Sequence, residues 1–151
     1  RTLSCKGPYG EFEIRTADPG ASTVLIAGGT GITPFCAFME EALGCPGTAA
    51  APVRLYYGAR NAELLLYAPL VERCRATLPR FDARLFAEEG APGAGVERGR
   101  LDIGQIAADC AGDPKAQFYV SGPPAMIAAF AGHLRDACGV PPDRVHVDAW
   151  E

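Results

Sequence analysis

The sequence has few of the features that mark a nucleic-acid-binding, membrane or metal protein. Its formal net charge is −4, and its 14 Lys and Arg residues are spread along the 151-residue chain, so no basic stripe is present to neutralise nucleic-acid phosphates. No apolar run approaches the roughly 20 residues that cross a bilayer. Neither of the two histidines lies near a cluster of cysteines. We therefore expect no nucleic acid, no membrane and no metal among its partners.

The six cysteines lack the spacing of a disulfide framework or a metal site. No pair has C-x-x-C spacing, and the closest two, Cys36 and Cys45, are nine residues apart. A chain of this length can bury a core large enough to fold without cross-links. We expect reduced, mostly buried thiols, as in a cytoplasmic protein.

Segments with the pattern of buried strands alternate with segments of helical periodicity. Apolar, β-branched or alternating runs predict strands at residues 23–27, 53–57, 81–86, 117–120 and 144–150. Apolar stripes at helical spacing lie between these runs. The alternation is typical of an open parallel sheet with helices on both sides. We predict a three-layer α/β fold with five parallel strands in the order 3-2-1-4-5.

Helix starts can be predicted at two positions. Thr33 is predicted to be the N-cap of the first helix, with Pro34 as the first helical residue. Asp102, followed three residues later by Gln105, predicts a capping box at the start of a later helix.

The second half of the chain carries three further predictions. The strand at 81–86 is less apolar than the others and is predicted to be an edge strand. Residues 88–99 hold four glycines and one proline and are predicted to form a loop. The last strand alternates, so we expect Val145 and Val147 on one face and Asp148 on the other, with the strand half buried.

Two glycine-rich turns follow predicted strands of this sheet. Residues 28–34 join the first strand to its helix, and residues 121–126 join the fourth strand to the next helix. Ligands of open parallel sheets bind beyond the carboxyl ends of the strands. Glycines allow close approach of the backbone to a phosphate, and helix N-termini attract anions. Either turn alone also fits ordinary packing, but the two on neighbouring strands favour a pyrophosphate site.

The first turn differs from two common phosphate-binding motifs. It has no Gly-Lys-Ser/Thr sequence, which disfavours a P-loop. The acidic residue that ends the second strand in an ordinary dinucleotide fold is also missing, and Arg60 follows that strand instead.

Together these motifs resemble the ferredoxin–NADP reductase-like flavin reductases, and within them the reductase components of bacterial oxygenases. The matching segments occur in the order of that family and cover nearly the whole chain. They are residues 7–12, 25–34, 57–60, 65–67, 119–126 and 147–151.

The resemblance implies an NAD(P)H-binding domain that follows a flavin-binding β-barrel on the same polypeptide. In that family hydride passes from NAD(P)H to FAD, and electrons then pass to an iron–sulfur or haem acceptor. We therefore expect residues 1–19 to be the tail of the barrel and a linker, and residues 20–151 to be the NAD(P)-binding domain. Because the chain begins at Arg1, we expect it to be a piece of a longer polypeptide and to be inactive alone.

The resemblance also assigns site residues. Those expected to bind the dinucleotide are Gly28, Gly29, Thr30, Gly31, Ile32, Thr33, Pro34, Gly58, Arg60, Gly122, Pro123, Pro124 and Met126. Those expected along the domain seam near FAD are Gly7, Pro8, Tyr9 and Gly10. Those expected near the reacting rings, as catalytic residues, are Ser121, Asp148 and Trp150. The family more often has Cys at position 121, so a thiol role does not carry over.

The sequence leaves a second possibility open for the coenzyme and another for the class of function. Glu88 and Glu89 follow the third strand and would repel a 2′-phosphate, which favours NADH over NADPH, although Arg60 fits either. A non-enzymatic nucleotide-sensing or docking module would need the same turn at residues 28–34. Residues 7–12 match the end of a flavin barrel and favour the reductase.

Overall fold

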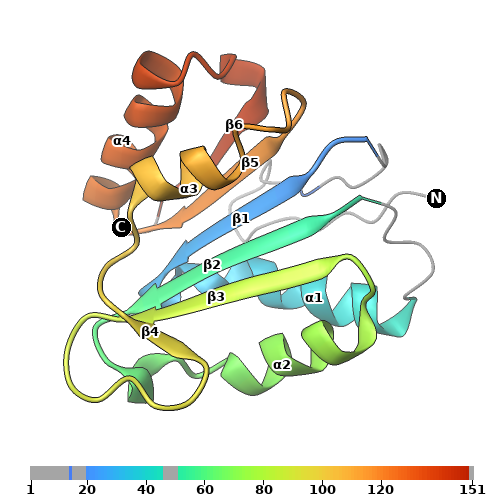
Figure 1. Cartoon of the computed structure of the whole chain (residues 1–151), viewed down its shortest axis with the longest axis vertical. Helices are drawn as coiled ribbons and strands as arrows, with labels where there is room; N and C mark the ends of the chain where they lie inside the picture. The colour runs from blue at the N-terminus through green and yellow to red at the C-terminus, as the bar shows by residue number, and fades with distance from the viewer. Residues whose placement is uncertain (1–13, 15–19, 46–50, 150–151) are drawn as a thin grey trace.

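The centre of the fold is a six-stranded sheet in which every strand is parallel to its neighbours. A computed structural model describes residues 14, 20–45 and 51–149 of the chain (Figure 1). The strand order is β4-β3-β2-β1-β5-β6. The strands are β1 Thr23–Gly28, β2 Val53–Ala59, β3 Phe81–Ala87, β4 Val96–Arg98, β5 Gln117–Gly122 and β6 Val145–Ala149.

Helices flank the sheet on both faces, as predicted. They are α1 Thr33–Gly44, α2 Ala68–Thr77, α3 Ile103–Asp109 and α4 Pro124–Gly132, with short 3₁₀ turns at Gly29–Ile32, Ala62–Leu64 and Pro142–Arg144 and a π-helical turn at His133–Ala137. α1 and α2 lie on one face of the sheet, and α3 and α4 lie on the other (Figure 1). In the part of the chain that the structure describes, no helix is long and apolar enough to span a membrane.

Strand β1 lies between the two apolar cores and contributes to both. All six of its residues are buried. Leu25 points into the core that contains Phe35 and Leu55 under α1 and α2, whereas Val24 and Ile26 point into the core under α3 and α4. A strand buried on both faces needs a continuous apolar run, and this explains the pattern that predicted it.

The sheet contains one strand more than predicted. The five predicted strands have the predicted relative order, but β4 adds a sixth within residues 88–99, which were wrongly predicted to be only a loop. It pairs with β3 through Leu85 and Val96, so β3 is not an edge strand. Three residues between glycines are too few to show strand periodicity, and this is why the sequence pattern missed β4.

The prediction for the last strand was wrong in one respect. Val145 is buried in the core under α3 and α4, but Val147 on the same face is 40% exposed. Asp148, on the opposite face, is buried. Strand β6 lies at the sheet edge, and this core reaches Val145 without including Val147, so alternation along the strand did not predict burial.

The first helix begins one residue earlier than predicted. Its N-cap position is Ile32, which offers no side-chain cap, and Thr33 is already helical. The Thr33 hydroxyl instead donates a hydrogen bond to the carbonyl of Thr30 at 2.9 Å. The 3₁₀ turn at Gly29–Ile32 leads directly into α1, so no extended residue is left to serve as a conventional cap.

Candidate functional site

The two glycine-rich turns lie side by side at the carboxyl edge of the sheet. Strands β1 and β5 are neighbours, and Ala27 is opposite Ser121 in their register. After β1 the chain turns into α1, and after β5 it passes through Pro123 into α4. The prediction that both turns end neighbouring central strands is therefore confirmed.

The turns touch through their backbones at Gly31. A Cβ atom at this position would lie 2.2 Å from the carbonyl oxygen of Ser121 and 2.7 Å from the nitrogen of Gly122. Real Cβ atoms do not approach backbone so closely, so only glycine fits here. Gly31 therefore fixes the distance between the two turns.

Met126 covers the joint between the turns from the start of α4. A Cβ at Gly28 would lie 2.5 Å from the Met126 sulfur, and a Cβ at Gly122 would lie 2.9 Å from its Cε. Met126 also packs against the core under α3 and α4. The Met126 side chain therefore packs at the edge of this core and also covers the contact between the two glycine-rich turns.

Exposure divides the predicted dinucleotide residues of the first turn into two groups. Gly29, Thr30 and Thr33 are exposed. The buried members of the turn are Gly28, Gly31, Ile32 and Pro34. The exposed group is available to touch a ligand, and the buried group shapes the turn beneath it.

The exposed part of the turn has the geometry of an anion site. Gly29 has a φ of +56°, which favours glycine, and its missing Cβ faces open space. The 12-residue helix α1 begins just beyond it, and Ile32 at its N-cap position makes no side-chain capping hydrogen bond. The positive end of a helix dipole attracts phosphate groups.

Ser121 and Asp148 are brought together at the ends of β5 and β6. They are opposite each other in the parallel register, and both are buried, with exposures of 0% and 6%. Within the described ranges, the Oδ2 atom of Asp148 is the one buried side-chain oxygen or nitrogen with no hydrogen-bond partner. Burial raises the pKa of Asp148 above its ordinary value.

Some predicted site residues cannot be placed. Gly7, Pro8, Tyr9, Gly10 and Trp150 lie outside the described residues.

A second group of charged residues lies at the carboxyl ends of β2 and β3. The amide of Glu89 donates to the carbonyl of Arg60 at 2.8 Å, which places these two segments next to each other. Arg100 reaches the same corner and forms an ion pair with Glu88, with 3.1 Å between Nε and Oε1. Sequence reasoning missed Arg100, because nothing in the pattern showed that residues 88–99 return toward the end of β3.

Gly58 has a packing role at this edge. A Cβ at Gly58 would lie 2.8 Å from Cγ of Leu101. The predicted cofactor-binding position is therefore buried under the segment that precedes α3, while Arg60 remains exposed.

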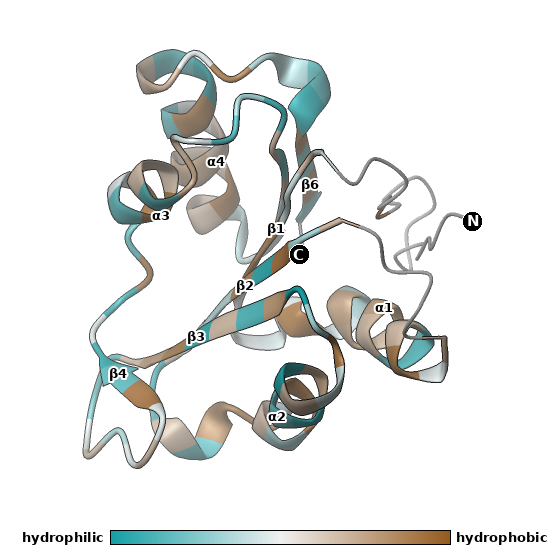
Figure 2. Cartoon of the chain, turned by 45° about the vertical axis from the view of Figure 1, so that its right-hand side comes forward, coloured by the Kyte–Doolittle hydropathy of each residue, from teal (hydrophilic) through white to brown (hydrophobic). Residues whose placement is uncertain are grey.

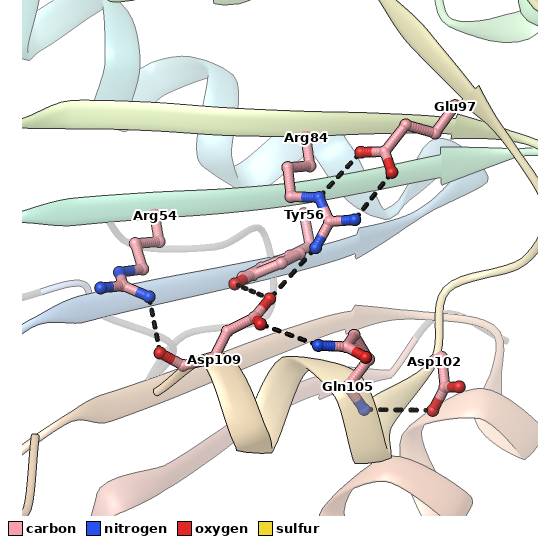
Figure 3. A network of polar contacts seen from close by, with 7 residues as sticks. All are labelled: Arg54, Tyr56, Arg84, Glu97, Asp102, Gln105 and Asp109. Carbon is pink, nitrogen blue, oxygen red and sulfur yellow. Dashed lines mark hydrogen bonds and ion pairs between the residues drawn. The ribbon is translucent and has the colours of Figure 1, made fainter. Parts of the chain in front are cut away.

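A polar network, also missed by the sequence, lies on the face of β2 and β3 opposite α1 and α2 (Figure 3). The Arg84 guanidinium donates to both carboxylate oxygens of Glu97 at 2.7 Å and to Oδ2 of Asp109 at 3.1 Å. The Tyr56 hydroxyl donates to the same Asp109 oxygen at 3.0 Å. These contacts tie β2, β3, β4 and α3 together.

The electrostatics of the network follow from these contacts. The hydrogen bonds from Arg84 lower the pKa of Glu97. For Asp109, burial acts to raise the pKa, but hydrogen bonds from Gln105 and Tyr56 and the charge of Arg84 outweigh it, and the pKa is lowered. Both carboxylates are therefore ionised near neutral pH, as a bidentate arginine pair requires.

The residues of the network are far apart in the sequence and belong to three strands and a helix. Asp102 and Gln105, at the start of α3, gave a signal in the sequence as a predicted capping box. The carboxylate of Asp102 accepts from the amides of Gly104 and Gln105, so the predicted cap is confirmed. The Gln105 side chain donates to Asp109 instead of completing the capping box.

Within the described residues, no group of three or more His, Cys, Asp or Glu side chains is placed to hold a metal ion.

Comparisons with known proteins show the family of this chain. A family model described as the oxidoreductase NAD-binding domain matches residues 25–131. The chain is 29% identical over 157 residues to ferredoxin–NADP reductase B of Sorangium cellulosum, covering 99% of this chain and 62% of the relative. It is 33% identical over 152 residues to the ferredoxin–NAD(+) reductase component of the alkene monooxygenase system of Xanthobacter autotrophicus, covering 98% and 44%.

A solved structure shares the fold. The flavohemoglobin of Malassezia yamatoensis, with bound FAD and haem, superposes with a TM-score of 0.71 at 23% identity, covering 89% of this chain and 33% of that protein. This chain thus spans less than two thirds of the length of each of these proteins.

Proposed function

Since this chain belongs to the oxidoreductase NAD-binding domain family, we propose that it is the NAD(P)H-binding part of a flavin-dependent electron-transfer reductase. The observation that carries the proposal is the backbone contact of Gly31 with Ser121 and Gly122, which joins the two glycine-rich turns at the carboxyl edge. The exposed residues Gly29, Thr30 and Thr33 follow β1 on one side of that contact, and the buried polar residues Ser121 and Asp148 lie on β5 and β6 on the other.

The pyrophosphate of the dinucleotide would lie on the first turn. Gly29, Thr30 and Thr33 are the exposed residues there, and the start of α1 supplies the positive end of a helix dipole. The buried residues Gly28, Gly31, Ile32 and Pro34 hold this surface in shape. The missing Cβ of Gly29 leaves room for a phosphate, so the residues present fit the group.

The nicotinamide half would lie against the second turn. Gly122, Pro123, Pro124 and Met126 would bracket its ribose, and Ser121 and Asp148 would lie near the ring. Donation of hydride is the chemistry that NAD(P)H supplies once bound. The protein's part is to position and to exclude water, and the burial of Ser121 and Asp148 suits that part.

The adenosine half would extend over the ends of β2 and β3, on the other side of the first turn. Arg60 is exposed there, and Glu88 lies beside it with Arg100 as its ion-pair partner. A carboxylate suits the 2′-hydroxyl of NADH and repels the 2′-phosphate of NADPH. We propose NADH as the preferred coenzyme on this basis.

The rest of the reductase would come from other domains. Residues 1–19 would be the end of a flavin-binding barrel and a linker, and residues 20–151 the NAD(P)-binding domain. FAD would be held mainly by the barrel, close to Gly7, Pro8, Tyr9, Gly10 and Trp150, and electrons would leave for an iron–sulfur or haem acceptor. The relatives' names, the FAD and haem of the flavohemoglobin, and the partial coverage of these proteins support this arrangement. The five described cysteines are free thiols, which favours the cytoplasm.

Titration of the chain with NADH, followed by NMR, tests the proposal. We expect the amides of Gly29, Thr30, Gly31 and Gly122 to shift at millimolar NADH. The amide of Gly112, in the turn after α3 and away from the carboxyl edge, is the internal control. Unchanged spectra at the two turns would refute dinucleotide binding. NADH oxidation by the chain when it is joined to its upstream polypeptide, with an artificial electron acceptor, would separate the reductase from a non-enzymatic nucleotide sensor.

A further inference from the structure

The segment between β3 and α3, residues 88–102, crosses the carboxyl edge at the ends of β2 and β3. Figure 1 shows it in yellow, looping beyond the arrowheads of these strands before it enters α3. The amides of Glu88 and Glu89 bond to the carbonyls of Ala59 and Arg60, and Leu101 packs on Gly58. We call residues 88–102 the β3–α3 connection. Its contacts place it at the carboxyl ends of β2 and β3, where the adenosine half would lie.

The connection has little conformational preference of its own. Four of its glycines, at positions 90, 93, 95 and 99, have positive φ values between 73° and 133°. Ordering a glycine-rich segment costs more free energy than ordering other segments, because glycine loses more conformational freedom on folding than other residues do. Contacts with the rest of the protein must therefore hold it in place.

Arg84 on β3 binds the middle of the connection through its side chain. Its guanidinium forms a bidentate pair with Glu97, in the middle of β4, with both bonds at 2.7 Å. A third nitrogen bonds to Asp109 at the end of α3. Arg84 thus ties both the middle of the connection and the helix that follows it to β3 (Figure 3).

Further contacts connect the β3–α3 connection to the charged residues at the carboxyl ends of β2 and β3. Within the connection, Arg98 donates to the carbonyl of Gly90 at 3.1 Å, and two residues later Arg100 pairs with Glu88. The amide of Gly99 bonds to Ala87 at the end of β3 at 2.9 Å. If β4 moved away from β3, the side chains of Arg98 and Arg100 would move with it.

We infer that Arg84, through its bidentate pair with Glu97, is a positioning residue that holds the β3–α3 connection in the form that binds the adenosine half of the coenzyme. The inference rests on the proposed function. Arg84 lies on the sheet face, and by this proposal it acts on the ligand only through the connection. It therefore affects recognition of adenosine and leaves recognition of nicotinamide intact.

Two fragments of the coenzyme separate these effects. ADP carries the adenosine and a pyrophosphate, and nicotinamide mononucleotide lacks the adenosine. In NMR titrations of the full chain, we expect Arg84→Met to raise the Kd for ADP about three- to tenfold and to leave the Kd for nicotinamide mononucleotide unchanged. If the connection is binding-competent in only about a tenth to a third of the molecules, the apparent Kd rises by the reciprocal of that fraction, about three- to tenfold. Amides of residues 88–102 should also exchange faster with solvent.

Matched variants control for general effects. Arg75 on α2 has nearly the same side-chain exposure as Arg84, 38% against 37%, and pairs with Glu72 at 3.1 Å. Arg75→Met should change neither Kd. Arg84→Lys keeps the charge without the planar fork and should give a Kd for ADP between those of the wild type and Arg84→Met.

The outcomes distinguish this inference from the proposed function. An unchanged Kd for ADP in Arg84→Met, or an equal rise for both fragments, overturns the inference even if the wild type binds NADH at the two turns. If the wild type binds neither fragment and shows no NADH shifts, the proposed function fails as well. If Arg84→Met does not fold, Glu97→Gln removes the same bidentate contact and must show the same split between the fragments.

Discussion

At the scale of single residues, Gly31 is the position that tolerates least change. A Cβ there would meet the backbone of Ser121 at 2.2 Å, and backbone cannot turn aside as a side chain can. We predict that Gly31→Ala lowers the free energy of unfolding by about 1–3 kcal/mol and abolishes NADH binding, because the two turns must separate. Urea denaturation and NMR titration measure the two effects.

Gly132→Ala is the matched control. Gly132 ends α4, and a Cβ there would meet nothing within 4 Å. Alanine in a helix is favoured over glycine by about 0.5–1 kcal/mol, so this variant should be as stable as the wild type or more stable, with NADH binding unchanged. Wild-type stability and binding in Gly31→Ala would contradict the role given to this contact.

Glu88 is predicted to decide between the two coenzymes. Its carboxylate forms an ion pair with Arg100, and the backbone amides of Glu88 and Glu89 donate to the carbonyls of Ala59 and Arg60. In Glu88→Gln both arginines become available to a 2′-phosphate, so the ratio of the NADPH Kd to the NADH Kd should fall about tenfold, the effect of one charged hydrogen bond. Glu63→Gln, in the exposed turn after β2, is the control. A ratio that is the same in wild type and Glu88→Gln would rule out this role.

Asp148 is predicted to destabilise the described domain when ionised. Burial raises its pKa, so the folded state binds this proton more readily than the unfolded chain. Stability is therefore lost as the pH rises from the ordinary aspartate pKa of about 3.9 through the pKa of the folded state. Asp148→Asn should be more stable than the wild type by about 1 kcal/mol at pH 7, with the difference vanishing near pH 3.

Urea denaturation at pH 3, 5 and 7 checks this, with Asp136→Asn at an exposed site as the control. A difference that is independent of pH would show that ionisation of Asp148 does not destabilise the folded state.

The sequence located the two turns of the candidate site, but it did not predict the exposure or the neighbours of their residues. The motifs located the turns, because glycines at strand ends are a local signal. In the structure, Gly29, Thr30 and Thr33 are exposed and the other residues of the same turn are buried. This difference in exposure depends on the packing of α1, which the motif does not contain. The pairing of Ser121 with Asp148 depends on the register of β5 and β6, which no local pattern contains.

At the scale of elements, the network around Arg84 joins a strand of three residues to the sheet. Glu97 and Asp109 have lowered pKa values in the folded state. Their contribution to stability is present above the ordinary carboxylate pKa of about 4 and is lost as the pH falls through their folded pKa values. We predict that Glu97→Gln lowers the free energy of unfolding at pH 7 by about 0.5–1 kcal/mol, a small value because the pair is partly exposed.

The same variant should lose less stability than the wild type between pH 5 and pH 3, and urea denaturation across that range measures it. Glu72→Gln, which removes an exposed pair within one turn of α2, should follow the wild-type profile more closely. Parallel profiles for wild type and Glu97→Gln would show that the pair contributes nothing to folding.

Elements with strong periodicity were predictable, and those held by distant contacts were not. In Figure 2, β3 alternates between hydrophilic and hydrophobic residues, because one face packs on α2 and the other carries Asp82 and Arg84. The lower apolar content that comes with this polar face suggested an edge strand. It reflects a polar face that no helix fully covers, and β4 pairs beyond it.

At the scale of the whole molecule, a ligand that binds only the folded state must raise its stability. At an NADH concentration ten times the Kd, the free energy of unfolding should rise by about 1.4 kcal/mol. Thermal or urea denaturation at several NADH concentrations measures the increase, and Gly31→Ala should show none. Stability that does not depend on NADH concentration would contradict binding to the folded domain.

The position of β5 in the sheet also has a consequence for the synthesis of the protein. β1 and β2 leave the ribosome early, but one side of β1 stays unpaired until β5, which follows β2, β3, β4 and three helices in the chain. Long-range parallel pairing of this kind forms late and slowly. A nascent chain that ends before Gln117 should therefore expose the edge of β1 and need a chaperone to avoid aggregation. The coenzyme site, which needs Gly31 against Ser121, is among the last parts of the domain to form.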